Sequence, residues 1–203
     1  MSQTTTMPIV GCTSDPPRIG VYQSRMIERY RLFLRKCDDP QILDIGPICG
    51  QNIDYLINRY TRIHVCDLIQ RLGPEPLQPI EAEAIVPWFD YDENSFDGIH
   101  LWDVPDHLDD RALKQLMALC CAILKPNGLL MVIASTTGSP QPYQHYAVIG
   151  DEMMVTLMKS NSFRLPYFHR SNRDLEMAMK PLEQSCSFVC MNGIREFLFK
   201  KVY

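Results

Sequence analysis

The chain has 203 residues, 46% of them hydrophobic and 22% charged, which suits one globular domain with a full core. A formal net charge of -4 gives no broad cationic field, so we do not expect nucleic acid as a partner and favour a small-molecule substrate. No stretch approaches the roughly 20 apolar residues that span a bilayer, and the start does not resemble a leader sequence. We therefore expect a cytoplasmic protein without membrane contact; its oligomeric state stays open.

The eight cysteines include no CxxC pair, so the spacing typical of zinc sites is absent and no metal is expected. Six of them lie inside apolar segments, where a reduced thiol behaves as a small hydrophobic side chain. We predict that they belong to the core.

The first part of the chain alternates between two periodicities. Residues 1–20 predict a flexible N-terminal segment, and residues 21–203 a single domain. The stretch SRMIERYRLFLRK, from Ser24 to Lys36, predicts an amphipathic helix. The apolar runs QILDI, RIHVC, DGIHLWDV and GLLMVIAS then suit strands buried on both faces, with helical patterns between them. This alternation predicts a parallel sheet covered by helices on both faces.

The last third of the chain departs from this alternation. Residues 136–171 are too long for a simple connection and predict an insertion or cover over the sheet, with a short helical pattern at DEMMVTLMK. Its polar aromatic residues Tyr143, His145 and Tyr146 suit an acceptor-site lid or a loop packed on the sheet edge. A helix capped by Ser171 and a hairpin turning at Asn192-Gly193 follow.

The stretch QILDIGPICG, residues 41–50, has the composition of a ligand-binding strand end. Asp44 lies near the end of the strand, Gly46 can turn without a Cβ penalty, and Gly50 permits close approach of a ligand or of the next helix. Pro47 has no N–H and no lysine follows Gly50, so the loop is poor for a pyrophosphate. It suits a ligand without phosphates, such as a nucleoside that carries an amino acid.

A second acidic residue follows the next predicted strand. Asp67 ends the run RIHVCDL, about 20 residues beyond the first glycine, where a carboxylate can accept hydrogen bonds from both ribose hydroxyls. A lone acidic residue after a strand is often only a solvated loop charge. Both readings stay open at this point.

Four motifs in order, within residues 40–135, resemble a class I S-adenosylmethionine-dependent methyltransferase. ILDIGPICG resembles the glycine loop DxGxGxG, IHVCDL the ribose-binding strand, SFDGIHLWDVPDHLDD the fourth strand and its turn, and ILKPNGLLMVIAS the fifth. The LKPNG turn is the most specific of these. The closing helix and hairpin also resemble the end of the family's fold.

The resemblance implies a Rossmann-like α/β fold, a three-layer sandwich with a seven-stranded sheet whose last strand alone is antiparallel. It also implies S-adenosylmethionine as the cofactor and methyl transfer to an unidentified small molecule. The cofactor-binding residues that it implies are Asp44, Gly46, Pro47, Ile48, Gly50, Asp67, Leu68, Asp90, Trp102 and Asp103. Asp90, after the run AIVPWF, corresponds to the family's acidic residue near the adenine amino group.

Asp106 and His107 are the catalytic candidates. The resemblance to the family's turn after the fourth strand places them near the reactive methyl group, and a histidine has the pKa range of a general base. The alternative is that both residues cap the next helix.

The glycine loop departs from the family at Ile48, which stands where a middle glycine is expected. The loop resembles a GPxxG variant found among poorly characterised members, and a branched side chain there narrows the room above the loop. This departure supports the alternative of a catalytically silent methyltransferase-like binding or assembly module.

Overall fold

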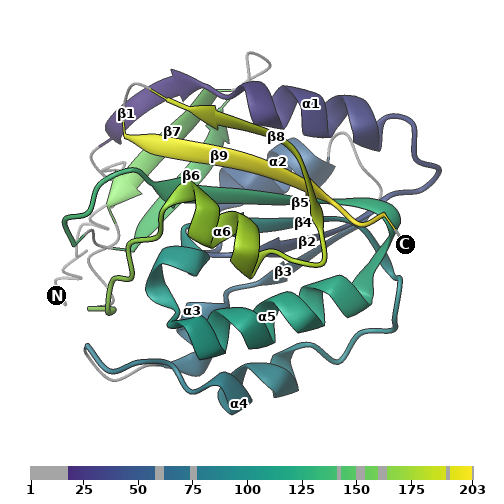
Figure 1. Ribbon diagram of the computed structural model, residues 1–203. Helices are drawn as coiled ribbons and strands as arrows, with labels where there is room; N and C mark the ends of the chain where they lie inside the picture. The colour runs from purple at the N-terminus through teal and green to yellow at the C-terminus, as the bar shows by residue number, and fades with distance from the viewer. Residues whose placement is uncertain are drawn as a thin grey trace, which may run out of the picture.

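The computed structural model describes residues 18–57, 62–73, 77–140, 143–149, 154–159, 164–190 and 193–202. These residues form two sheets: a six-stranded sheet with the order β3-β2-β4-β5-β9-β8 and a three-stranded sheet with the order β1-β7-β6 (Figure 1). The strands of the larger sheet are β2 (Gln41–Ile45), β3 (Arg62–Cys66), β4 (Phe96–Trp102), β5 (Leu124–Ser135), β8 (Glu183–Val189) and β9 (Ile194–Lys200). Those of the smaller sheet are β1 (Arg18–Gln23), β6 (Gln144–Ile149) and β7 (Met154–Lys159).

The larger sheet confirms the predicted fold class. Strands β3, β2, β4 and β5 pair in parallel, β9 pairs with β5 in the antiparallel sense, and β8 returns along β9 as the predicted hairpin. The predicted number of seven strands is wrong for the described residues, which place six strands in this sheet.

The family resemblance implies a third strand before Asp90, at AIVPWF, where the structure has helices instead. Helix α4 (Ala82–Ile85) runs directly into the 3-10 helix η1 (Val86–Trp88). Pro87 has no N–H for a strand ladder, whereas its fixed φ suits the first turn of a helix. The local chemistry of Pro87 therefore outweighs the strand-like run of apolar residues.

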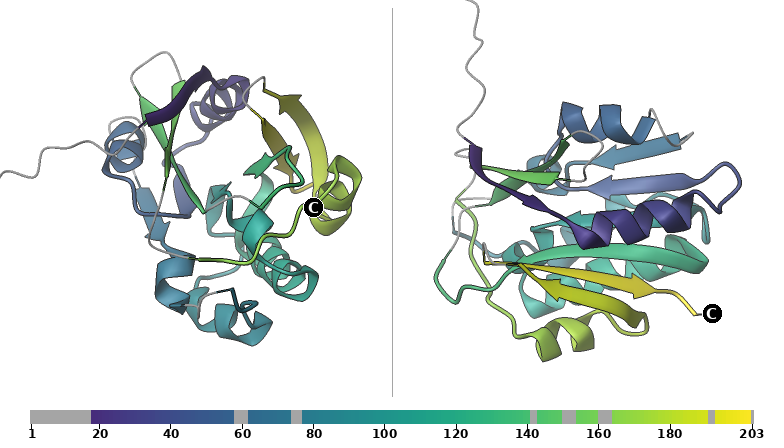
Figure 2. Two further views of the ribbon diagram at one scale, coloured as in Figure 1. Left: turned by 90° about the vertical axis from the view of Figure 1, so that its left-hand side faces the viewer. Right: turned by 90° about the horizontal axis from the view of Figure 1, so that it is seen from above.

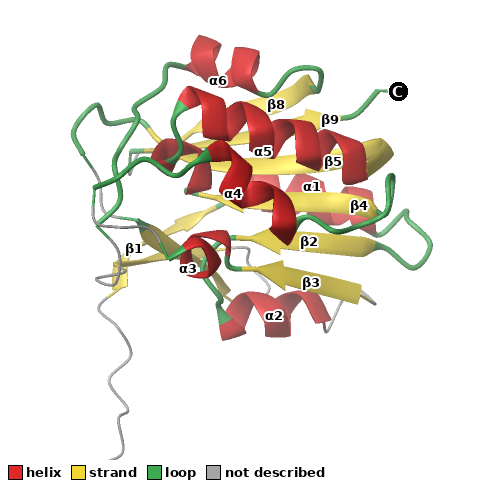
Figure 3. Ribbon diagram, turned by 90° about the horizontal axis from the view of Figure 1, so that it is seen from below, coloured by secondary structure: helices red, strands yellow, loops and turns green. Residues whose placement is uncertain are grey.

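Helices cover both faces of the larger sheet. Helices α1 (Arg25–Leu34) and α2 (Gly50–Ile57) lie on one face, and α3 (Leu68–Leu72), α4 and α5 (Asp110–Ile123) lie on the other (Figures 1 and 3). Helix α6 (Asn172–Ala178) packs beside α5. The predicted cap is present, since Ser171 forms a capping box with Asp174. The Ser24 hydroxyl also caps α1 by accepting from the Ile27 N–H at 3.1 Å.

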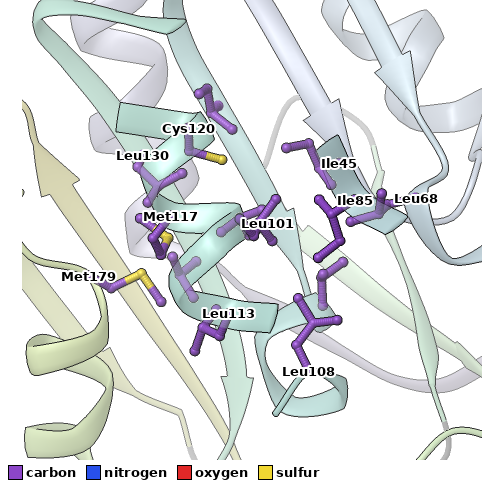
Figure 4. Packing of buried hydrophobic residues seen from close by; sticks show 14 of the residues in the cluster. Ile45, Leu68, Ile85, Leu101, Leu108, Leu113, Met117, Cys120, Leu130 and Met179 are labelled. Atoms are coloured by element: carbon purple, nitrogen blue, oxygen red, sulfur yellow. The ribbon is translucent and has the colours of Figure 1, made fainter. Parts of the chain in front are cut away.

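Each face of the sheet has its own hydrophobic cluster. On the side of α5, side chains from β2, β4 and β5 interlock with one face of that helix (Figure 4). Its members include Ile45, Leu101, Leu113, Met117, Cys120 and Leu130. On the side of α1 and α2, the buried residues include Met26, Tyr30, Ile42, Leu56, Trp102 and Met131. Burying each large side chain stabilises the fold by about 1.5–3 kcal/mol, so the two clusters hold the helices against the sheet.

Strands β6 and β7 of the smaller sheet lie within residues 136–171, the segment predicted as an insertion or cover, and β1 joins them from the N-terminal part of the chain. The helical pattern predicted at DEMMVTLMK is wrong for Met154–Lys159, because β7 pairs with β1 on one side and β6 on the other. Backbone pairing to two strands outweighs the local periodicity. This sheet lies beyond the carboxyl ends of β2 and β3 (Figures 2 and 3). Strand β1 begins at Arg18, before the predicted domain start at residue 21; residues 1–17 lie outside the described residues.

The LKPNG stretch and the outer strand β8 each depart from regular strand structure. The LKPNG turn reverses the chain after α5, with Asn127 in the left-handed conformation at φ 66°. Strand β8 is the outermost strand beside β9, and its pairing shifts register between Gln184 and Cys186. Among the described residues, no helix is both long and apolar enough to cross a bilayer.

Candidate functional site

The carboxyl ends of three neighbouring strands bring the predicted cofactor residues together. Asp44 lies in β2, Asp67 directly follows β3, and Asp103 directly follows β4. Strand β2 lies between the other two in the sheet. In open parallel sheets, ligands usually bind at the carboxyl ends of two neighbouring strands whose connections run in opposite directions along the sheet.

Asp44 holds the tryptophan that shapes the glycine loop. Its buried carboxylate accepts hydrogen bonds from the Trp102 indole N–H and from Nδ1 of His100, the latter at 3.1 Å. The Trp102 ring packs against Gly46, where an added Cβ would lie 2.8 Å from the Trp102 Cδ1 atom. Glycine is therefore required at position 46 because the indole occupies the place of a side chain.

The isoleucine in the glycine loop is largely exposed and has an ordinary backbone conformation. The Ile48 side chain is 58% exposed, and Ile48 is not among the described residues with positive φ. Its N–H donates to Oδ2 of Asp67 at 3.2 Å. At Gly50 an added Cβ would meet nothing within 4 Å, so the space beside the start of α2 is open; Pro47 is buried.

Asp67 links the glycine loop to the next helix. Oδ1 of Asp67 accepts from the Gln70 N–H at 3.1 Å and caps α3, while Oδ2 accepts the Ile48 N–H. Leu68 beside it is fully buried. Asp67 is thus more than a solvated loop charge: each of its oxygens holds one backbone N–H and retains a second acceptor position.

Asp103 connects β4 to the cover. It adopts the left-handed conformation at φ 57°, which is uncommon for a residue other than glycine although tolerated by aspartate. Its buried Oδ2 accepts from the Gln144 N–H at 3.0 Å and lies 3.3 Å from Nε2 of His107. The carboxylate therefore binds the first residue of β6 and the turn η2 (Val104–His107) together.

His107 lies between two hydrogen-bond acceptors. Its Nδ1 is 2.9 Å from the Pro166 carbonyl oxygen, and its Nε2 faces Asp103. Burial lowers the pKa of His107, but the bonds to Asp103 and Pro166 outweigh it and the net pKa is raised. Both acceptors are satisfied only by the doubly protonated imidazolium ring. The predicted role of His107 as a general base stays a prediction.

Asp106 is also completely buried, and its Oδ2 accepts from the Ser135 N–H at 2.7 Å. Its Oδ1 has no hydrogen-bond partner among the described residues. Burial, helped by the negative charge of Asp103, raises the pKa of Asp106 to about 7. Neither Asp106 nor His107 caps α5, since the Asp109 side chain does so by accepting from the Ala112 N–H at 2.8 Å.

Asp90 is the predicted site residue that the structure does not join to the others. It is exposed and follows η1, and among the described residues no hydrogen bond or ion pair links it to Asp67 or Asp103. Its predicted contact with an adenine group stays a prediction.

Two further residues, Asn52 and Arg170, hold parts of the site together. The sequence analysis did not single them out. Asn52 of α2 donates from Nδ2 to the Tyr146 carbonyl and accepts from the Val148 N–H, both at 2.8 Å. Arg170, 5% exposed, donates to the carbonyls of Pro105 and Leu108 at 2.6 and 2.8 Å and holds the turn η2. The position of Asn52 on the apolar face of a helix could have indicated a buried hydrogen-bonding role. Nothing in the local sequence distinguishes Arg170 from a surface arginine.

The aromatic residues of the cover lie over the site. Tyr143 and Tyr146 are 1% and 3% exposed; the Tyr143 ring stands edge-on to His107 with centroids 5.3 Å apart, and the Tyr146 ring stacks on Trp102 at 6.1 Å. The side chain of His145 lies outside the described part. Among the described residues, no group of three or more His, Cys, Asp or Glu side chains is arranged to bind a metal.

No protein-family model and no curated protein matches the chain. Among solved structures, similarity extends to the N-methyltransferase NodS from Bradyrhizobium japonicum (TM-score 0.52, 15% identity, 88% of this chain and 95% of that one). An S-adenosylmethionine-dependent methyltransferase from Clostridium acetobutylicum gives TM-score 0.52 and 15% identity over 85% and 91% of the two chains.

A third similar structure contains a ligand. The 1,6-didemethyltoxoflavin-N1-methyltransferase from Burkholderia thailandensis, with bound 1,6-didemethyltoxoflavin and S-adenosylhomocysteine, gives TM-score 0.51 and 16% identity. The similarity covers 88% of this chain and 79% of that one. The chain therefore has the fold of the class I S-adenosylmethionine-dependent methyltransferases.

Proposed function

We propose that the protein binds S-adenosylmethionine at the carboxyl ends of β2, β3 and β4 and transfers its methyl group to a small molecule. The observation that carries this proposal is the meeting of three carboxylates, Asp44, Asp67 and Asp103, at that edge of a methyltransferase fold. An acidic edge complements the positive charge of a sulfonium and the hydroxyls of a ribose.

The residues of the loop fit this ligand. Asp67 keeps an acceptor position on each oxygen for the ribose hydroxyls. Ile48 points its side chain outward, and the space beside Gly50 is open. The departure from the family's glycine pattern at Ile48 thus leaves the loop usable, because neither the backbone conformation nor the packing there requires glycine.

S-adenosylmethionine supplies an already activated methyl group, so the protein mainly has to align the acceptor and take up a proton where one is released. Of the two catalytic candidates, we assign the proton to Asp106, whose Oδ1 has no partner among the described residues and whose pKa is about 7. We assign His107 a positioning role between Asp103 and Pro166.

A small-molecule acceptor is supported by the acidic net charge of -4 and by the toxoflavin-precursor methyltransferase among the similar structures. The alternative, a catalytically silent module, predicts the same fold without cofactor affinity. Titration calorimetry with S-adenosylmethionine and S-adenosylhomocysteine separates the two. No heat from either ligand with folded protein at high micromolar concentration would contradict the proposal and favour the module.

Asp67→Ala tests the ribose contact. Loss of charge-assisted hydrogen bonds worth on the order of 1.5–3 kcal/mol should weaken S-adenosylhomocysteine binding roughly ten- to hundredfold. Because Asp67 also caps α3, the variant should lose about 0.5–2 kcal/mol of folding stability. Asp109→Ala is the matched control, since it removes the cap of α5 and should lower stability without changing affinity. Equal affinity of both variants would remove the ribose assignment.

A further inference from the structure

Tyr143 lies deepest among the aromatic residues of the cover. Its side chain is 1% exposed and belongs to the hydrophobic cluster that includes Leu68, Val104 and Leu108. Those residues follow the ends of β3 and β4. The ring therefore belongs to the same hydrophobic cluster as residues that follow the predicted cofactor residues Asp67 and Asp103.

The phenol group of Tyr143 is buried beside His107, the residue that Asp103 binds. Burial raises its pKa well above the usual value, and the charges that raise it further are those of Asp67, Asp103 and Asp44. Its hydroxyl has no hydrogen-bond partner among the described residues, although the ring packs edge-on against His107. A buried hydroxyl without a hydrogen-bond partner is unfavourable, so the burial of the Tyr143 hydroxyl destabilises the arrangement that the structure shows.

The strand that follows Tyr143 is fastened at three points beside the same site. The Gln144 N–H donates to Asp103, the Asn52 amide bridges Tyr146 and Val148 of β6, and the Tyr146 ring stacks on Trp102. Every anchor is supplied by a residue next to the glycine loop or at the end of β4. Strand β6 with Tyr143 therefore forms a strap across the crevice.

We propose that Tyr143 occupies the nucleoside subsite of the crevice and that this strap must swing outward before a ligand binds. The proposal rests on the proposed function for the identity of the ligand. Tyr143 shares its hydrophobic cluster with Leu68 and Val104, which directly follow Asp67 and Asp103, so its ring takes up volume that a flat base bound beside these carboxylates would need. The described structure is then a self-occupied, closed state.

Affinity in such a system is reduced by the fraction of molecules in the open state. Tyr143→Ala removes the ring that competes with the base and should tighten S-adenosylhomocysteine binding by roughly tenfold. Tyr143→Phe removes only the unpaired hydroxyl, favours the closed state and should weaken binding several-fold. Phe33→Ala, on α1 away from the crevice, removes an aromatic ring of similar size and should leave the affinity unchanged.

Titration calorimetry with S-adenosylhomocysteine on the wild type and these three variants tests the proposal. Opposite shifts for Tyr143→Ala and Tyr143→Phe support it. Weaker binding by both variants would make Tyr143 an ordinary ligand contact, and unchanged binding by both would make it a core residue; either result overturns the inference while wild-type binding upholds the proposed function.

Hydrogen exchange of the β6 amides in the free protein provides a readout that needs no ligand. Exchange at Gln144 and Val148 should be faster in Tyr143→Ala and slower in Tyr143→Phe than in the wild type. If exchange changes in this way and no variant binds S-adenosylhomocysteine, the proposed function fails while the strap stands. Unchanged exchange in Tyr143→Ala would overturn the strap even where the ligand binds.

Discussion

Asp106 and His107 are neighbours in the turn after β4, and their surroundings favour a neutral Asp106 and a charged His107. Asp106 is buried with one unpaired oxygen and favours its neutral form, whereas His107 lies between two acceptors and favours its charged form. In each case the folded state holds a proton more tightly than the unfolded state does. Raising the pH therefore works against folding at both residues.

We expect the free energy of unfolding to fall between pH 5 and pH 8. The pKa of Asp106 is raised from 3.8 to about 7, so stability is lost as the pH rises between these values, by at most about 1.4 kcal/mol per pH unit. The pKa of His107 is raised above 6.5, so its contribution is present below that value and lost as the pH rises through the folded-state pKa. Urea denaturation across this range measures the slope.

Asp106→Asn isolates the carboxyl group. It keeps an acceptor for the Ser135 N–H and cannot ionise, so its stability should depend less on pH and should exceed that of the wild type above pH 7. The exposed loop residue Asp92 provides the control, because Asp92→Asn should retain the wild-type slope. Parallel profiles for Asp106→Asn and the wild type would contradict the assignment.

Single residues were predictable from the sequence where spacing alone fixes their place. Asp67 and Gly46 follow strands that must be neighbours, so their meeting needed no further information. The surroundings of His107 depend on Pro166 and on Gln144 through Asp103, which come from a cover that no local pattern places. The sequence therefore indicated the residue but not the imidazolium arrangement.

At the scale of elements, one polar side chain links α2 to the backbone of β6, beside the hydrophobic cluster that both elements share. Asn52 pairs with the Tyr146 carbonyl and the Val148 N–H as a neighbouring strand would. Asn52→Ala leaves both backbone groups buried without these partners, at about 1–3 kcal/mol each. We expect a loss of folding stability on the order of 2 kcal/mol or more, measured by urea denaturation, and faster hydrogen exchange at Val148.

Gln51→Ala, at the exposed neighbouring position of α2, is the matched control and should change stability by no more than about 0.5 kcal/mol. Equal stability of Asn52→Ala and Gln51→Ala would show that the amide does not hold β6.

Elements with strong internal signals were predicted correctly, as the amphipathic pattern of α1 shows, whose apolar residues Met26 and Tyr30 are buried. The errors lie where the pattern is weak or the partner distant. The strand-like run around Pro87 forms α4 and η1, because proline suits the first turn of a helix. The segment predicted as a helix forms β7, because β1 and β6 pair with it. A strand fixed by long-range pairing carries little of its own signal.

For the molecule as a whole, the alternation of strand and helix and the family resemblance together predicted the fold class, because chain connections in parallel sheets allow few arrangements. The structure places the strands in the order β3-β2-β4-β5-β9-β8, with β2 and β3 as neighbours. The second sheet was not predictable, since β1 and β7 come from parts of the chain far apart in sequence.

The thiols report on the integrity of the whole fold. Cys12 lies outside the described residues, and the seven described cysteines are free; burial raises the pKa of Cys66 to about 11 and that of Cys120 well above its usual value. The thiolate is the reactive form, so iodoacetamide at pH 8 should modify the half-buried Cys37 before the buried Cys66 and Cys120, which should stay unmodified until the protein unfolds. Peptide mass spectrometry before and after addition of urea measures this.

Equal labelling rates for Cys120 and Cys37 in the native protein would contradict this packing. Complete labelling of both in urea is the control, since it shows that the reagent reaches every site once the core is open.

The shift of register in β8 bears on the solubility of the protein. An outer strand presents unpaired N–H and C=O groups onto which an extended segment of another chain can add, and such additions lead to aggregation. The irregularity between Gln184 and Cys186 interrupts that row and twists the strand locally, while Glu183 at its start adds a charge. Deleting one residue between Gln184 and Cys186 would restore a regular register with β9. Strand β8 would then present a longer straight row of unpaired backbone groups to which another chain could add.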